Sequence, residues 1–370
     1  MGRIGVRKKK KLRTFIGITF RFVLIVAALC LFISYISSYI DPSRFSVPFF
    51  FGLYFIPILA INLLLFIVAL LLRSKSAWIP FIAILPTMLF AERFYKFGST
   101  KADIKDANIV KIETYNVGKF YLSKEKLSIP EALNGVVSQI KESQPDIVCL
   151  QEVFFQNVDV IAKIFPDYKY QTHHLFIYGR GNVSGNLILS KYEIIHGEVI
   201  NFKHSTNLSL CADIVIHKDT IRVYNNHLES NAISPTTLIK NIRENKTNSK
   251  VLSEEIINVH SRLSTTGKRR AKQVEAVLKN IQHSPYPAII CGDLNDIPMS
   301  YTYHKLYTGN KDTFRESGKG FSATYSMAWP LLRIDYVFIP QHFISVSHTT
   351  VICNYSDHYP VIAEFAIPIQ

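Results

Sequence analysis

The feature that most constrains this chain is a run of 19 residues without a charged side chain, Phe22–Ile40. A helix of about 20 apolar residues is long enough to cross the hydrocarbon core of a bilayer. The basic cluster Arg7–Arg13 precedes the run, and no small-residue cleavage site follows it. A signal peptide would have a shorter apolar region and such a site. The run therefore predicts a membrane-spanning helix near the N-terminus.

Two further uncharged runs follow, Phe45–Leu72 with 28 residues and Ala77–Ala91 with 15 residues. The first of these is also expected to cross the membrane. The second is either a third span or a re-entrant or interfacial segment, because 15 helical residues measure only about 22 Å. We predict the third span, since Trp78 and Tyr95 flank it with side chains that favour the membrane interface. Residues 1–93 would then form an anchor of three transmembrane helices.

The positive charges before the first span predict the orientation of the anchor. Lys and Arg residues concentrate on the cytoplasmic side of membrane proteins, so the cluster Arg7–Arg13 places the N-terminus in the cytoplasm. Three spans then leave the rest of the chain outside the cytoplasm, whereas two spans would leave it inside. We predict an integral protein of the plasma (inner) membrane. A tether, residues 94–108, would join its anchor to an extracytoplasmic domain, residues 109–370.

The net charge of +14 suggests a nucleic-acid function, but this charge is unevenly distributed along the chain. Residues 1–99 contain 13 of the 42 Lys and Arg residues and 2 of the 28 Asp and Glu residues. The remaining 271 residues therefore hold 29 basic and 26 acidic side chains, a surplus of only +3. Binding to duplex DNA relies on many Lys and Arg contacts to phosphate. The nearly neutral C-terminal region does not favour such a partner.

Beyond Asn108 the sequence alternates between strand-like and helix-like patterns. Residues 109–115 form a strand pattern that ends at Asn116, and Ile147–Leu150 is a continuous apolar run typical of a buried strand. Between them, Ser128 and Glu131 form a capping box that begins a helix. Further strands are predicted at residues 186–189, 214–216, 221–225, 288–291, 334–339 and 360–365, with a helix at about 268–282 and an Asn- and Lys-rich insertion at 240–250. The alternation predicts an α/β domain.

Polar side chains stand at or beside the ends of six of these strands. They are Asn116, Glu152, His227, Asp293 with Asn295, Asp335, and Asp357 with His358. Each alone has an ordinary explanation, because a Gly-Asp pair after a strand is usually a turn and an Asp-His pair is usually a local contact. Together they suggest one shared rim. Carboxylate and amide oxygens suit Mg²⁺, and imidazoles suit proton transfer near neutral pH.

Taken in order, these segments resemble the endonuclease/exonuclease/phosphatase family. The matching segments are Tyr115-Asn-Val, Leu150-Gln-Glu, Gly185-Asn-Leu-Ile-Leu-Ser-Lys, Asn225-Asn-His-Leu, Gly292-Asp-Leu-Asn-Asp, Arg333-Ile-Asp-Tyr-Val and Ser356-Asp-His-Tyr-Pro. The resemblance covers residues 109–366. It implies an α/β fold, a four-layer α/β sandwich of two packed β-sheets flanked by helices, here preceded by the transmembrane helical anchor.

The resemblance also assigns metal ligands. It implies that Glu152 is the principal ligand of a Mg²⁺ ion, with Mn²⁺ as the alternative metal. Asn116 would lie beside Glu152, and Asp357 would lie near a second metal position.

Five further residues receive catalytic roles from the same resemblance. Asp293 and Asn295 would face the phosphate and the attacking water. His358, oriented by Asp335, would act either as a general base or as a group that polarises the phosphate. His227 would stabilise the charge of the transition state or protonate the leaving group.

These assignments imply a Mg²⁺-dependent phosphoesterase. Membrane anchoring raises the effective concentration of the enzyme at lipid head groups, which favours a phospholipid or sphingolipid substrate. A surface nuclease is the alternative. A membrane sensor or transporter with a vestigial domain is disfavoured, because the predicted first two spans contain no ionisable Asp, Glu, Lys or His that could mark a transport path. The expected partners are the lipid bilayer and a phosphate ester, with no obligate protein partner.

Overall fold

The computed structural model describes residues 2–98, 104, 107–123, 125–179, 181–231, 243, 249–328 and 330–368. Most of the predicted insertion at 240–250 and part of the predicted tether at 94–108 lie outside these residues. The chain divides into two compact units. One comprises Met1–Ala91 with Met299–Tyr301, and the other comprises Glu92–Pro298 with Thr302–Gln370.

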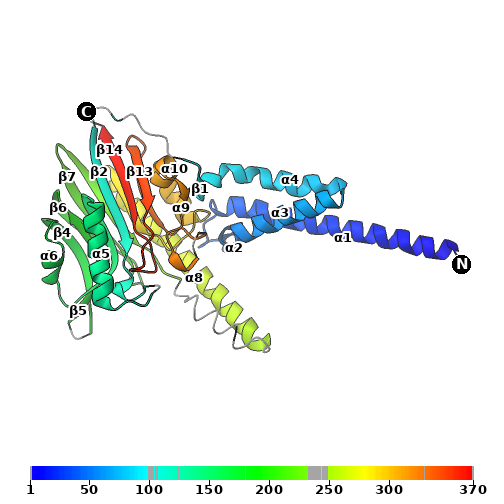
Figure 1. Cartoon of the computed structure of the whole chain (residues 1–370), viewed down its shortest axis with the longest axis horizontal. Helices are drawn as coiled ribbons and strands as arrows, with labels where there is room; N and C mark the ends of the chain where they lie inside the picture. The colour runs from blue at the N-terminus through cyan, green and yellow to red at the C-terminus, as the bar shows by residue number, and fades with distance from the viewer. Residues whose placement is uncertain are drawn as a thin grey trace. The chain divides into compact units, whose positions relative to one another are not determined.

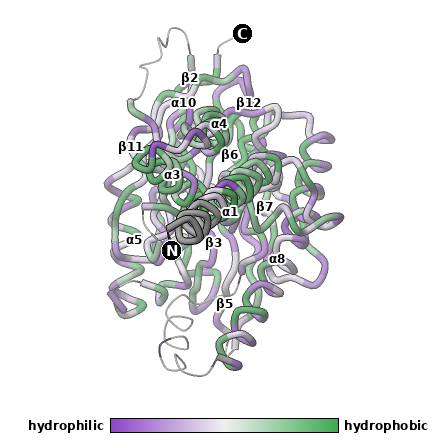
Figure 2. The backbone as a smooth tube through the Cα atoms, turned by 90° about the vertical axis from the view of Figure 1, so that its right-hand side faces the viewer, coloured by the Kyte–Doolittle hydropathy of each residue, from purple (hydrophilic) through white to green (hydrophobic). Residues whose placement is uncertain are grey.

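The N-terminal unit is helical. Its elements are α1 (Gly2–Ser37), α2 (Val47–Leu53), α3 (Phe55–Leu71), η1 (Lys75–Ala77), α4 (Trp78–Ile84) and η2 (Leu85–Leu89). Helices α2 and α3 meet at a bend of 70°. Pro57 lies just after this bend, and it has no N–H with which to continue a helical ladder through the break. In Figure 2, hydrophobic colouring predominates in α3 and in the described turns of α1.

The described residues contain one helix that is long and apolar enough to cross a membrane, Thr14–Ser37, which is most of α1. A second candidate exists if the bent pair α2–α3 forms a single span. The third apolar segment, Lys75–Leu89, is shorter than a span. An apolar helix near the N-terminus is also what a signal sequence would show, so the three-span anchor and its orientation stay predictions.

The second unit contains two six-stranded mixed sheets (Figure 1). The first sheet has the order β10 (Asn310–Asp312), β12 (Asp335–Pro340), β9 (Ala288–Asp293), β8 (Asp219–His227), β7 (Leu208–Ile216) and β6 (Glu193–Asn201). The second has the order β13 (Ile344–Thr350), β14 (Val361–Pro368), β2 (Ala107–Asn116), β3 (Ile147–Phe155), β5 (Asn182–Ser190) and β4 (Tyr170–Tyr178). Apolar side chains from both sheets form one buried core between them.

Alternation along β3 shows how the layers are built. Ile147 and Cys149 belong to the core between the sheets. Val148 and Leu150 belong to a second buried cluster, which they share with helix α5 (Ile129–Ser143) and helix α6 (Val160–Ile164). Because successive residues of a strand point to opposite faces, the continuous apolar run is buried on both sides. This confirms the strand predicted at Ile147–Leu150.

Helices on the far side of the first sheet complete the fourth layer. Helix α8 (Ser249–His283) contacts β8 through the hydrogen bond from Tyr224 Oη to Asn280 Oδ1, 2.9 Å long. Helix α9 (Tyr301–Tyr307) places Tyr303 against Tyr336 and Phe338 of β12. A short helix, α10 (Thr313–Ser317), lies between β10 and β11 (Gly320–Phe321) in the chain. The four-layer α/β sandwich is therefore confirmed, and the helix predicted at 268–282 is the C-terminal half of α8.

The end of the predicted anchor and the start of the predicted tether pack within the second unit. Arg93 is only 6% exposed, and its Nη1 donates to the carbonyl of Pro298 at 2.8 Å. Strand β1 (Tyr95–Lys96) pairs with β11, where the rings of Tyr95 and Phe321 meet edge to face. The compact unit thus begins near Glu92 rather than at residue 109, and at least residues 92–96 are a docked segment.

Candidate active site

Parallel strand pairs bring the predicted site residues to one end of the sandwich. Strands β2 and β3 run parallel in the second sheet, and β8 and β9 run parallel in the first. Parallel neighbours end at the same edge of a sheet. The register of β8 and β9 places His227 directly beside Asp293, and Asn116 ends β2 next to Gln151, the residue before Glu152.

Asn116 links the two sheets at this end. Its Nδ2 donates to Asp293 Oδ2 at 3.0 Å and lies 3.3 Å from Glu152 Oε1. Its Oδ1 accepts the N–H of Gly118 at 3.0 Å. The amide therefore presents its nitrogen to both carboxylates in this structure. A metal ligand would need the amide oxygen on that side.

Glu152 reaches the rim through an irregularity in β3. The pairing of β3 with β5 shifts register between Leu150 and Val153, and Glu152 itself has a φ of +52°. Such a β-bulge adds a residue to one strand and redirects the side chains beside it. The carboxylate of Glu152 lies 3.5 Å from His227 Nε2. The bulge thus turns Glu152 toward the end of the other sheet.

Asp293 is the most central of the carboxylates and is 1% exposed. Asn295, at a φ of +51°, folds back so that its N–H and its Nδ2 donate to the two oxygens of Asp293 at 2.7 and 3.0 Å. His227 Nε2 and His358 Nε2 each lie 3.9 Å from Asp293 Oδ2. Asp293 is therefore held by amide donors and faced by two imidazoles.

Asp335 and His358 form a hydrogen-bonded pair beside Asp293. Asp335 begins β12 and is the register partner of Asp293. His358 Nδ1 lies 3.0 Å from Asp335 Oδ2, which leaves Nε2 directed to the Asp293 side. The backbone N–H of His358 donates to Ser356 Oγ, and Ser356 Oγ donates to the carbonyl of Asn116 at 2.8 Å. The loop that carries the imidazole is thereby tied to the end of β2.

The charges of the cluster shift several pKa values. Burial raises the pKa of Asp293 to about 6, although His358 lowers it. Burial alone would lower the pKa of His358, but the carboxylates of Asp335 and Asp293 outweigh it and raise that pKa to about 10. Burial tends to raise the pKa of Glu152, yet His227 and Asn116 bring it below its usual value. The nearby carboxylates therefore favour the charged form of His358, and His227 and Asn116 favour the ionised form of Glu152.

Asp357 completes the predicted set. Its carboxylate is half-buried, and Ser356 Oγ lies 3.4 Å from its Oδ1. Burial raises the pKa of Asp357, His358 lowers it, and the nearby negative charge of Glu152 raises it again. The structure thus gathers all eight predicted residues at one end of the domain, with Asp357 on the Glu152 side.

The donor set fits a divalent cation. Four carboxylates, those of Glu152, Asp293, Asp335 and Asp357, face two imidazoles, so a cation would offset an excess of negative charge. Two buried atoms of the cluster, His227 Nε2 and Asp335 Oδ1, have no hydrogen-bond partner among the described residues.

Two positions for the cation compete. Ligand atoms of Asp293, Asp335 and His358 lie within 4.8 Å of one another, but the Asp335–His358 hydrogen bond already uses that group. We favour the position at Glu152, because the Glu152 side chain is 22% exposed and its contact with His227 Nε2, 3.5 Å long, is not a hydrogen bond.

The sequence offers four basic residues that could hold phosphate, although solvated surface charge is the more common role of such residues: Arg180, Lys191, Arg222 and Arg270. Arg222 pairs with Asp213, with 2.8 Å between Nη2 and Oδ2. Arg270 is 1% exposed and contacts Asp296. Lys191 lies at the other end of β5 beside Asp146, and Arg180 is outside the described residues. None of the three described side chains is a phosphate ligand in this arrangement.

The structure adds residues that the sequence patterns did not indicate. The ring of Tyr325 contacts that of His358 edge to face, with 5.3 Å between the centroids. Thr324 Oγ1 accepts the N–H groups of Ile334 and Asp335 and so fixes the start of β12. Lys119 acts on Glu152 by its positive charge. A side chain in an irregular loop gives no periodic signal, so only the three-dimensional arrangement identifies these three.

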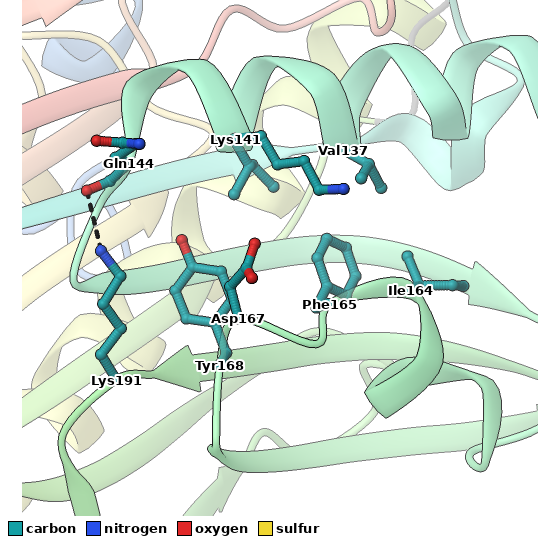
Figure 3. Close-up of a pocket in the computed structure, with 9 residues that line it drawn as sticks. Val137, Lys141, Gln144, Ile164, Phe165, Asp167, Tyr168 and Lys191 are labelled. Carbon is teal, nitrogen blue, oxygen red and sulfur yellow. Dashed lines mark hydrogen bonds between the residues drawn. The ribbon is translucent and has the colours of Figure 1, made fainter.

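A separate pocket of about 450 Å³ lies at the opposite end of the second sheet. Figure 3 shows Val137, Lys141, Phe165 and Tyr168 along its walls, with Lys191 bonded to the carbonyl of Gln144 at its edge. None of the eight predicted site residues lines it. This pocket is therefore separate from the cluster at the Glu152 end.

Comparison with known proteins agrees with this geometry. The sequence model of the endonuclease/exonuclease/phosphatase family matches residues 114–358, a span that contains all eight site residues. A model described as a domain of unknown function matches residues 16–94. No curated protein matches the chain.

Several solved structures share the fold. An endonuclease/exonuclease/phosphatase from Bacteroides vulgatus has a TM-score of 0.52 and is 16% identical, covering 70% of this chain and 98% of that one. The human Nocturnin catalytic domain with a bound sulfate anion has a TM-score of 0.51 at 15% identity, covering 70% and 96%. Humanized D. rerio TDP2 with 14 mutations has a TM-score of 0.50 at 19% identity, covering 70% and 98%. The family match over more than half of the chain, together with this shared fold, shows that the chain belongs to the endonuclease/exonuclease/phosphatase family.

Proposed function

We propose that this chain is a membrane-anchored phosphoesterase that hydrolyses a phosphate ester by attack of water and depends on a divalent metal ion, Mg²⁺ or Mn²⁺. The observation that carries the proposal is the His358–Asp335 hydrogen bond of 3.0 Å with His358 Nε2 facing Asp293. Burying an imidazole between two carboxylates costs free energy. Such an arrangement is therefore typical of a functional site.

The position and charge of each residue in the cluster suggest its role in the reaction. A cation held by Glu152, with Asp357 and Asn116 nearby, would offset negative charge on the phosphate oxygens. His358, charged at neutral pH because its pKa is raised to about 10, donates from Nε2 to a phosphate oxygen. This favours the phosphate-polarising role over that of a general base.

Asp293 and Asn295 then act on the attacking water. The pKa of Asp293 is about 6, so at neutral pH its carboxylate can accept a proton from water. Asn295 fixes the carboxylate through its two donated hydrogen bonds. His227, whose Nε2 has no hydrogen-bond partner among the described residues, is available to the leaving oxygen.

We propose a phospholipid or sphingolipid phosphoester as the substrate. The apolar helix Thr14–Ser37 would hold the catalytic unit at a lipid surface, which raises the effective concentration of head groups. The near-neutral charge of residues 100–370 also disfavours a polyanion.

The test is hydrolysis by the purified full chain in detergent. The panel should contain bis-p-nitrophenyl phosphate, sphingomyelin, phosphatidylinositol phosphates and plasmid DNA, each with Mg²⁺ and with EDTA. Turnover should vanish in EDTA and return with Mg²⁺ or Mn²⁺. Full turnover in EDTA would refute the metal assignment, and turnover of plasmid DNA alone would refute the lipid assignment.

A further inference from the structure

One buried arginine on helix α8 contacts two loops that follow site residues. Arg270 is 1% exposed. Its Nη1 donates to the carbonyl of Glu229 and to Asn231 Oδ1, at 2.9 Å each. Its Nε lies 3.2 Å from Asp296 Oδ2, an ionic contact whose atoms are not aligned as a hydrogen bond. Among the described residues, Arg270 makes its polar contacts with these three alone.

The two loops begin directly after neighbouring strands of the first sheet. Strand β8 ends at His227, and residues 228–231 follow it. Strand β9 ends at Asp293, and residues 294–296 follow it. We call these segments the β8 loop and the β9 loop. Arg270 therefore contacts each loop within a few residues of a side chain of the site.

Two hydrogen bonds already join the loops at the strand ends. The N–H of Leu228 donates to the carbonyl of Asp293 at 3.0 Å, and Asn295 Nδ2 donates to the carbonyl of Leu228 at 3.0 Å. Because Leu228 directly follows His227, these bonds fix how His227 stands beside Asp293. Arg270 contacts the next residue along each loop, and so it closes the same junction a second time.

Both partners of Arg270 are themselves held by further contacts. The N–H of Glu229 donates to Gln273 Oε1 at 2.8 Å, and Gln273 lies on the next turn of α8. Asp296 Oδ2 accepts the hydroxyl of Thr302 at 2.8 Å, and Asp296 is 5% exposed. A guanidinium presents its donors in a rigid planar fork. Arg270 can therefore fix the position of one loop relative to the other.

Stability alone gives a weak reason for such a residue. Desolvation of a buried ion pair offsets most of its attraction, and apolar side chains of similar volume often stabilise a protein as well. The donors of Arg270 go to two loops rather than to the strands of the core. Those loops follow the residues that act on the water and on the leaving oxygen in the proposed reaction. This distribution of contacts indicates a role in alignment.

We propose that Arg270 is a positioning residue, whose buried guanidinium holds the β8 loop against the β9 loop and so aligns His227 with Asp293 on one phosphate. The inference rests on the proposed hydrolysis and adds a residue that does not touch the substrate. A misplacement of about 1 Å in a reacting group can lower a rate by on the order of 100-fold. Loss of the Arg270 contacts should therefore lower kcat far more than it changes KM.

The experiment measures kcat and KM of the full chain in detergent for bis-p-nitrophenyl phosphate with Mg²⁺. Arg270→Met removes every donor and should lower kcat at least roughly 30-fold, with KM within about threefold of wild type. Arg270→Lys keeps the charge, but one ammonium cannot span both loops as the fork does, so kcat should fall about tenfold. A kcat for Arg270→Lys within about twofold of wild type would overturn the inference, whether or not Arg270→Met folds.

The matched control is a second buried arginine. Arg222 lies near the start of β8, away from the site, and its Nη2 donates to Asp213 Oδ2 at 2.8 Å. Arg222→Met also leaves a buried aspartate without its arginine, so its midpoint in urea should fall, while kcat should stay within about twofold of wild type. An equal loss of kcat in Arg222→Met and Arg270→Met would overturn the inference.

A double-mutant cycle separates alignment from a general loss of structure. In a His227→Ala background no imidazole is left to align. Arg270→Lys should then lower kcat by a factor about three times smaller than it does in wild type. A general loss of structure would lower kcat equally in both backgrounds, and that result would overturn the inference.

Amide hydrogen exchange tests the same contacts without turnover. The N–H of Leu228 donates to the carbonyl of Asp293. Its exchange should be roughly fivefold faster in Arg270→Lys than in wild type, because the β8 loop is held less firmly, and unchanged in Arg222→Met. Unchanged exchange in Arg270→Lys would overturn the inference. If wild type shows no Mg²⁺-dependent turnover, the proposed hydrolysis itself is refuted, and the exchange still decides whether Arg270 holds the loops.

Discussion

Glu113 offers a sharp test of the electrostatics beneath the site. This residue of β2 lies three positions before Asn116 and is fully buried. Burial raises the pKa of its carboxyl to about 7 from 4.5, although hydrogen bonds from Ser143 and Gln139 lower it. The folded state therefore prefers the protonated form over a range of about 2.5 pH units.

The sign and size of the effect follow from linkage. Below pH 4.5 the Glu113 carboxyl is protonated in both the folded and the unfolded state, so this residue does not yet lower the stability. As the pH rises from 4.5 to 7 the unfolded state releases the proton first, so stability falls, and above pH 7 it falls no further from this cause. At 1.36 kcal/mol per unit, the loss is about 3 kcal/mol. Glu113→Gln resembles the protonated side chain and should lack this loss.

The difference in free energy of unfolding between the two proteins can be measured by urea unfolding of the full chain in detergent. Pulse proteolysis then reports the unfolded fraction of the catalytic unit. Glu113→Gln should match wild type at pH 4 and exceed it by up to about 3 kcal/mol at pH 8. Glu142→Gln, an exposed glutamate on α5, is the matched control and should follow wild type at both values. If the Glu113→Gln and wild-type proteins lose stability equally between pH 4 and pH 8, the reasoning is wrong.

Three further predictions concern the site, the docked segment and the orientation. Asp293→Ala and His358→Ala should each lower kcat at least about 100-fold with unchanged circular dichroism, because each removes a proton-transfer or charge-stabilising group; near wild-type turnover in His358→Ala would contradict the pair with Asp335. Arg93→Met should lower the free energy of unfolding of the catalytic unit by about 2 kcal/mol in urea, since it removes a buried charged donor from the carbonyl of Pro298; an unchanged midpoint and slope would contradict this. Fusions after residue 100 should give active alkaline phosphatase and dark green fluorescent protein, and the reverse result would place the domain in the cytoplasm.

Much of the site could be predicted because it depends on strand ends. The apolar runs before Asn116, His227 and Asp293 mark strands, and the α/β alternation implies parallel neighbours whose ends meet at one edge. The capping box at Ser128 likewise begins α5 at the expected residue. These signals are local, so they are readable without knowledge of the partner strand.

The irregular backbone at the site could not be predicted in the same way. Glu152 adopts a φ angle of +52°, which is uncommon for a residue other than glycine, asparagine, aspartate or histidine. The bulge at Glu152 exists because β3 pairs with β5 in two registers on either side of it. A pairing between distant segments decides it, and no window of the sequence contains both strands.

The basic residues show the same limit most clearly. Arg222 and Arg270 are both possible phosphate ligands in the sequence. In the fold, Arg222 is neutralised by Asp213 and Arg270 contacts Asp296, so neither charge is available to a substrate. The pairing of each charge, rather than its position in the sequence, therefore decides which basic residue can meet a phosphate.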